Sequence, residues 1–257
     1  MNIRAVAAEI DRVVVGLHYT AVGRHHTELG PRVDAIGVEA GEEFYDLTEF
    51  LAAGLCTEAV ARRRFPYDGN DAAASMLAKL QRELHLDEQL QPNPVLSELL
   101  QAILQAQADT AADVWPSELG NLQRDAESAF SKAKGPLVDA FRQLPVPETP
   151  AHQLLHTLTG VRYGRHDAHI EAWQSFGLSG PAVAALGAAV SGETLAQTPG
   201  TLREAGWVDE TGNATDEGRG VRSVIEARTD EGCEAMYRAV ADLEDWHDAL
   251  QALPGQV

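Results

Sequence analysis

The chain has 257 residues, of which 44% are hydrophobic, and its formal net charge is −19. This length allows a sizeable core, and the hydrophobic fraction predicts a folded protein rather than a disordered one. The acidic charge repels phosphate backbones and so argues against a nucleic-acid binder, and no apolar run approaches the ~20 residues that span a bilayer. Two cysteines are too few for a disulfide framework, and Glu9 and Asp11 interrupt the apolar N-terminus, so it does not resemble a signal peptide. We therefore expect a cytoplasmic protein with no membrane contact.

The first part of the chain, residues 1–144, is predicted to form a helical domain. Apolar spacing, prolines and glycines predict helices over residues 3–17, 43–64, 71–84, 93–111 and 116–144. Gly30-Pro31 is expected to break the chain, and Gly135-Pro136 to interrupt the last of these helices.

The segment PVPETP, residues 145–150, is a short stiff linker and predicts a domain boundary, so that the second domain covers residues 145–257. Pro150 begins a long helix that ends near Gly177, and helices follow over 178–192 and 194–205. Residues 206–220 are predicted to form two short strands around the turn 210–213. The rest, from 216 to 249, is predicted to be helical with a weak point at Gly232.

A helix, a turn, a second helix and a hairpin follow one another in a winged-helix domain. The stretch TEFLAAGLCTEAVA (48–61) lines up with EAWQSFGLSGPAVA (171–184), which suggests a second helix-turn-helix-like unit in the N-terminal half. The predicted fold is therefore mainly α: a helical N-terminal half followed by a degenerate winged-helix domain with a small β-hairpin wing.

The stretches PVPETPAHQLLHTLTGVRYGRHDAHIEAWQSFGLS and LREAGWVDETGNATDEGRGVRSVIEARTD resemble an actinobacterial group of MarR-like winged-helix or helix-turn-helix proteins. The residues that match its pattern are Arg162, Arg165, Asp167, His169, Gly206, Val208, Asp209, Thr215, Gly218 and Arg219. Trp207 departs from the leucine usual there, and the likeness covers about residues 145–232. The resemblance implies a fold and no reaction, because a fold does not fix a function.

The charge of the predicted winged helix argues against DNA reading. Residues 178–232 hold four arginines against nine acidic residues, a net charge near −5. The candidate recognition helix, within residues 193–206, offers only Arg203, and the wing turn carries Asp209 and Glu210 without a cation. Phosphate contacts need cations on both elements, so we expect DNA binding to have been lost.

The stretch VRYGRHDAHIEAW, residues 161–173, gathers histidine, arginine, aspartate and aromatic side chains on consecutive turns of the long helix. On a helical wheel one face is apolar and suits core packing; it holds Leu154, Leu158, Val161, Ala168 and Ala172. A second face suits partial burial with hydrogen bonds; it holds His152, His156, Thr159, Arg162, Tyr163, His166, His169 and Trp173. That face either lines a polar pocket closed by the N-terminal half, or forms a buried hydrogen-bond network or a dimer interface. Gly160 and Gly164 permit close backbone approach beside it.

If the second face lines a pocket, it and the residues around it supply candidate catalytic residues and candidate ligand-binding residues. His166 and His169 are the candidate catalytic acid and base, and Asp167 is the candidate residue that orients one of them. The candidate binding residues are Arg162 and Arg165 for an anion, Tyr163 and Trp173 as pocket walls, and His18 from across the pocket.

No metal or cofactor is expected. His152 with His156, and His166 with His169, are each spaced to share one ion, but the helix rise separates the two pairs by ~15 Å. The sequence also lacks the common zinc, nucleotide-loop and hydrolase motifs.

The first functional hypothesis is a small-molecule enzyme or enzyme subunit, in specialised metabolism as the resemblance suggests. Its chemistry would be cofactor-free acid/base work on an anionic substrate, by elimination, displacement or hydrolysis. The alternative is a MarR-like regulator that senses a ligand, and a third hypothesis is a non-catalytic binding protein. In each case the expected partner is a small-molecule ligand, DNA binding is not expected, and a homo- or heterodimer is.

Overall fold

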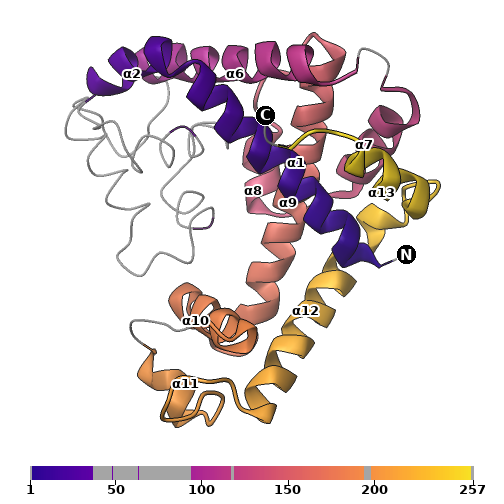
Figure 1. Ribbon diagram of the computed structural model, residues 1–257. Helices are drawn as coiled ribbons and strands as arrows, with labels where there is room; N and C mark the ends of the chain where they lie inside the picture. The colour runs from indigo at the N-terminus through magenta and orange to yellow at the C-terminus, as the bar shows by residue number, and fades with distance from the viewer. Residues whose placement is uncertain are drawn as a thin grey trace.

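The described part of the protein is a bundle of helices built around one long central helix (Figure 1). The computed structural model describes residues 2–36, 48, 63, 94–116, 119–193 and 198–255. Its helices are α1 (Ile3–Arg24), α2 (His26–Asp34), α6 (Pro94–Val114), α7 (Gly120–Lys132), α8 (Pro136–Phe141), α9 (Pro150–Gln174), α10 (Gly180–Ser191), α11 (Gly200–Glu204), α12 (Asp216–Tyr237) and α13 (Leu243–Gln251). The predicted helices at 43–64 and 71–84, and most of the repeat at 48–61, lie outside the described residues.

The long central helix, α9, begins at the predicted proline and packs against α1, α6, α7, α8 and α12. In Figure 1 it runs through the middle of the molecule, with α12 beside its second half. The glycines on its edge permit the predicted close contacts: a Cβ at Gly160 would lie 2.1 Å from Phe130, and one at Gly164 would lie 2.7 Å from Met236. Both positions exclude any side chain larger than hydrogen without displacement of the neighbour.

Two hydrophobic clusters divide the core along α9. The first combines α1, α2, α6, α7, α8 and the first half of α9 with the end of α12 and with α13. The second lies at the other end, where Trp173 and Ile170 of α9 pack with α10, with Leu202 of α11 and with Ile225 of α12. Helices α10 and α11, where the sequence predicts a helix-turn-helix, therefore pack on the far end of α9 and α12 (Figure 1). The domain boundary at 144/145 stays a prediction.

The mainly helical fold is confirmed, but the predicted two-stranded wing is wrong. In the described residues the only sheet pairing is one antiparallel bridge between Val208 and Ala214. The turn between them forms, because Asp209 N donates to Asn213 O at 2.9 Å. The hairpin extends no further because the Thr215 hydroxyl accepts from Gly218 N and caps α12, which begins at the next residue. Here the helix-start signal prevails over the strand pattern.

Two smaller predictions are also corrected. The chain breaks at His25, and α2 continues through Pro31, whose carbonyl still accepts from Ala35 N. The proline removes one helical N–H without ending the helix. Gly232 is not a weak point of α12: a Cβ there would lie 3.0 Å from the Cβ of Ala168, so this glycine permits close packing on α9. Within the described residues, no helix is both long and apolar enough to cross a membrane.

Candidate functional site

The candidate site lies between α9 and α12, where two of the predicted residues meet partners that the sequence analysis did not single out. Arg165 and His169 of α9 face Arg222, Glu226 and Asp230 of α12. We call these five residues the α9–α12 cluster. Their side chains are between 15% and 27% exposed, so the groups are partly buried but remain accessible to solvent.

Charges alternate along the α9–α12 cluster. Arg222 NH2 lies 2.7 Å from Oε1 of Glu226, and Arg165 NH2 lies 3.1 Å from Oε2 of the same carboxylate. Arg165 Nη1 lies 3.1 Å from Oδ1 of Asp230. Nε of Arg4, on α1, lies 2.6 Å from Oδ2 of the same carboxylate. Counting Arg4, three guanidinium groups meet two carboxylates, so this part of a strongly acidic protein is locally positive.

The hydrogen bonds of His169 fix its neutral tautomer. Its Nδ1 lies 3.0 Å from Thr229 Oγ1, and the Thr229 hydroxyl donates its single hydrogen to Ile225 O at 2.8 Å. The hydroxyl oxygen must therefore accept from the imidazole, so Nδ1 carries the hydrogen. The lone pair is left on Nε2, which faces Arg222 NH1 at 3.5 Å. This is the arrangement of a general base with a cation beside its basic atom.

Burial holds the His169 imidazole neutral near pH 7. Burial is the largest cause and, together with the charges of Arg222 and Arg165 and against the opposing charge of Glu226, it lowers the pKa from 6.5 to about 4. An anion bound between Nε2 and Arg222 would favour the imidazolium and raise this pKa. The state of His169 is therefore sensitive to what binds beside it.

The other two predicted catalytic residues lie on a different side of α9. The Asp167 carboxylate is 1% exposed, pairs with Arg63 and accepts from Leu137 N and Val138 N at 3.0 and 3.3 Å. Those amides are at the start of α8, so Asp167 caps that helix from outside. Burial raises the pKa of Asp167, and Arg63 together with the two amides opposes the rise.

His166 is on the same side as Asp167. Its Nε2 lies 2.8 Å from Arg63 O, and because a carbonyl only accepts, His166 donates from this atom. Arg63 also donates to Asp167 O, so one arginine connects both residues. In the described residues, the carboxylate that faces His169 is Glu226 and not Asp167.

The remaining predicted binding residues are distributed over the bundle. Arg162 donates to Asp11 of α1 at 2.6 Å, and Tyr163 is buried with its ring edge-on to Phe141. Trp173 is buried in the second cluster, and its Nε1–H has no hydrogen-bond partner among the residues that the structure describes. His18 accepts from Gln107 Nε2 at 2.9 Å and is hydrogen-bonded to Thr48. The structure brings Arg165 together with His169, and Asp167 together with His166, and places these others elsewhere.

Sequence reasoning missed the partners that complete these contacts: Arg63, Arg222, Glu226, Thr229 and Asp230. On α12 a signal existed, because positions 222, 226, 229 and 230 share one face at i, i+4, i+7 and i+8. From the sequence, these charged residues were considered only as part of the net charge of residues 178–232. Arg63 gave no such signal, because its contact with Asp167 joins residues 104 apart in the chain.

The histidines at the start of α9 pack as apolar groups. His156 stacks on Phe141 with ring centroids 4.5 Å apart, and burial lowers the pKa of both His152 and His156 from 6.5 to about 4. No three His, Cys, Asp or Glu side chains of the described residues are grouped as a metal ion would require.

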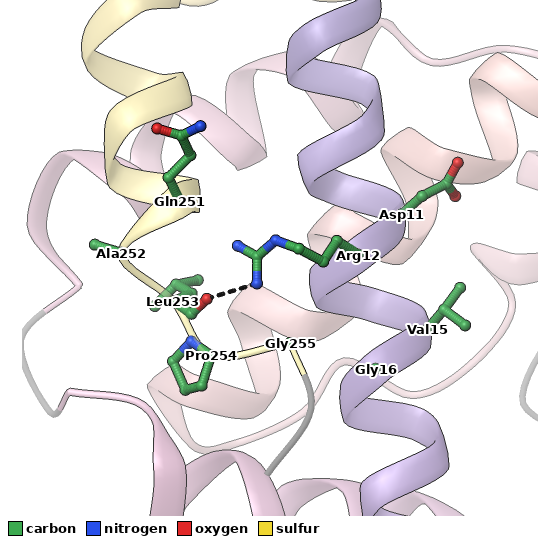
Figure 2. A pocket seen from close by; sticks show the side chains of 9 residues that line it. All are labelled: Asp11, Arg12, Val15, Gly16, Gln251, Ala252, Leu253, Pro254 and Gly255. Atoms are coloured by element: carbon green, nitrogen blue, oxygen red, sulfur yellow. Dashed lines mark hydrogen bonds between the residues drawn. The ribbon is translucent and has the colours of Figure 1, made fainter.

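A separate groove lies between α1 and the segment that follows α13 (Figure 2). Its floor is closed by Arg12, which donates to the carbonyls of Leu253 and Leu250 at 3.0 and 2.9 Å. Asp11, the partner of Arg162, is on its rim. Because Arg12 donates to one carbonyl in the last turn of α13 and to one in the segment after it, these contacts hold the C-terminal segment on α1.

One comparison with known proteins found a match. A family model described as a helix-turn-helix family matches residues 85–257, which include every helix from α6 to α13. Neither the curated proteins nor the solved structures gave a match.

Proposed function

The chain belongs to this helix-turn-helix family, and on that premise we propose that it is a small-molecule enzyme, or enzyme subunit, whose scaffold has lost DNA binding. The reaction is cofactor-free acid/base chemistry on an anionic substrate, by elimination, displacement or hydrolysis. A MarR-like and actinobacterial origin, a place in specialised metabolism and a dimeric state belong to the same proposal.

The observation that carries the proposal is the fixed tautomer of His169. Thr229 holds the hydrogen on Nδ1, so that the basic Nε2 lies beside the Arg222 guanidinium. A substrate anion held by Arg222 places its neighbouring C–H or O–H next to Nε2. The imidazole takes that proton, and the electron pair stays on the substrate or leaves with the departing group. The imidazolium then returns the proton to the product or to water.

The helix-turn-helix unit itself supports the loss of DNA reading. The candidate recognition helix α11 covers five residues, Gly200–Glu204, and its one cation is Arg203. Arg219 and Arg222 each pair with an acidic residue of α12, and Arg228 lies over the Phe176 ring. Cations engaged within the chain contribute less to phosphate contacts, and the segment carries a net negative charge.

The test compares two histidines of one helix that differ in surroundings. His169→Gln should slow proton abstraction from a substrate by about 10²-fold or more, because general acid/base groups contribute on that scale. His152→Gln, the matched control at the start of α9 and outside the predicted site, should change the rate only a few-fold. The measurement is loss of C–H signals in D₂O by ¹H NMR across a panel of small hydroxy carboxylates.

Two results would overturn this assignment. One is a His169→Gln protein that exchanges substrate protons as fast as the wild type. The other is a wild-type protein that exchanges no proton of any acid tested and shows no change in its His169 signal when they are added. The predicted roles of His166, Asp167, Arg162, Tyr163, Trp173 and His18 stay predictions.

The second candidate is a ligand-sensing transcriptional regulator, and membership of a helix-turn-helix family is the observation that favours it. In that case the α9–α12 cluster would bind an effector, and His169→Gln would weaken effector binding rather than turnover. Retention of duplex DNA with a steep dependence on salt concentration would favour this candidate over the enzyme.

A further inference from the structure

We propose that the α9–α12 cluster binds its ligand through a monoanionic carboxylate that replaces the Glu226 carboxylate between Arg165 and Arg222. This inference rests on the proposed function, because it takes the same cluster as the ligand site. It adds the chemical class of the ligand and the way in which the site opens.

The geometry of Glu226 is the first argument. Its two carboxylate oxygens are each bonded to a different arginine from a different helix, Oε2 to Arg165 of α9 at 3.1 Å and Oε1 to Arg222 of α12 at 2.7 Å. Two guanidinium groups arranged around one planar carboxylate form a receptor for that shape. Glu226 therefore fills, from within the chain, the position that a ligand carboxylate would take.

The local charge is the second argument. When the Glu226 side chain turns away, Arg165 and Arg222 remain, and Asp230 still pairs with Arg165 and with Arg4. Three cations then face one fixed carboxylate, and Glu226 itself stays nearby in solvent. A ligand with one negative charge restores the balance seen in the structure.

The cost of the exchange is small enough for a weakly held ligand. Glu226 is 17% exposed and belongs to a helix surface, so its flexible side chain can turn toward water. Partly exposed ion pairs are weak, because water and salt compete for both partners. The incoming carboxylate forms the same two pairs, so the net cost is mainly that of moving Glu226.

The exchange also places the ligand for chemistry. Arg222 bonds Glu226 through NH2 and faces His169 Nε2 through NH1 at 3.5 Å. A carboxylate on Arg222 therefore brings the atoms next to its carboxyl carbon close to the basic nitrogen. The groups around the His169 ring are Arg165 from its own helix and Arg222, Glu226 and Thr229 from α12.

The experiment measures acetate binding to the full chain by ¹⁵N-histidine NMR, with the His169 signal assigned from its loss in His169→Gln. Acetate should move that signal in the wild type. Glu226→Gln should tighten acetate binding about tenfold, because the competing carboxylate is gone. The matched control Glu234→Gln alters an exposed α12 pair with Arg238 and should leave the affinity unchanged. Arg222→Gln should abolish the shift, and thermal melts report whether each variant is folded.

The outcomes separate this inference from the proposed function. If anions move the His169 signal in the wild type but Glu226→Gln binds acetate no tighter, the exchange is wrong and the cluster remains a ligand site. If phosphate binds more tightly than acetate at equal ionic strength, the carboxylate class is wrong. If no anion moves the signal in the wild type or in Glu226→Gln, both the exchange and the proposed site fail.

Discussion

Two polar networks occupy different sides of α9 within a single turn and a half, and their solvent access differs sharply. On one side Asp167 is 1% exposed and is held by Arg63 and by two amides of α8. On the other side His169 is 15% exposed and lies beside charged groups that pair in alternating sign along α12. The Asp167 carboxylate is therefore sealed from water, whereas the groups around His169 remain partly open to it.

The difference follows from helical geometry. Positions 165 and 169 are four apart and share a face, whereas 167 points about 200° from 165. One face meets α12, a long helix with its own charges, and the other meets the start of α8. The same kinds of side chain are therefore sealed in the fold on one side and partly open to solvent on the other.

The largest expected effect on stability comes from a substitution in the buried network, at Asp167. Asp167→Ala should lower the free energy of unfolding by about 3 kcal/mol, because it leaves two buried α8 amides and the partly buried Arg63 guanidinium without this carboxylate. Urea unfolding followed by circular dichroism measures the loss.

The matched control for this change is Asp139→Ala. Asp139 is an exposed residue of α8 that pairs with Arg142, and exposed pairs contribute at most ~1 kcal/mol. If Asp167→Ala were no more destabilising than Asp139→Ala, the capping role of Asp167 would be wrong and the distinction between the two sides of α9 would disappear.

The sequence predicted the helices whose ends carry local signals. Pro94 and Pro150 each begin a helix where expected, and the wheel of α9 identified Leu154, Leu158 and Val161 as core residues. Such signals act between residues a few positions apart, so one chain suffices to see them. The hairpin failed because a strand pattern and a helix cap overlapped at Thr215.

The candidate site could be predicted only in part. The sequence placed Arg165 and His169 on helix α9 with suitable chemistry, but the functional hypothesis grouped His166 and Asp167 with them in a single acid/base site. The partner of each side chain depends on which helix packs against it: Thr229 lies 60 residues from His169. Neither spacing nor composition encodes that distance, so the separation of the two networks became visible only in the folded chain.

A change of pH should have an effect of intermediate size on the free energy of unfolding, because it titrates histidines that are buried in the folded chain. Burial lowers the pKa of His152, His156 and His169 from 6.5 to about 4. Between those pH values the unfolded chain binds more protons than the folded one, so the free energy of unfolding should fall as the pH drops from 6.5 to 4. Each histidine contributes at most ~1.4 kcal/mol per pH unit. Urea unfolding across this window measures the slope, and His169→Gln should flatten it.

Opposite behaviour would contradict the assignment of these groups. A free energy of unfolding that stays constant or rises on acidification means that the three imidazoles are not held neutral by burial. A His169→Gln protein with the wild-type slope would mean that the folded chain does not lower the pKa of His169.

The smallest expected effect on stability, and the most specific for chemistry, is that of Thr229→Val. Thr229 is fully buried, and valine keeps its shape while it removes the oxygen that accepts from His169 Nδ1. One neutral hydrogen bond contributes about 1 kcal/mol, so unfolding should change by roughly that amount. The same energy fixes the tautomer, so the variant should populate both neutral forms, and ¹⁵N shifts of the imidazole distinguish them.

Proton abstraction should slow while acetate affinity, which depends on Arg165 and Arg222, stays near its wild-type value. A variant with unchanged imidazole shifts would show that the Arg222 guanidinium beside Nε2, rather than Thr229, determines which nitrogen carries the hydrogen.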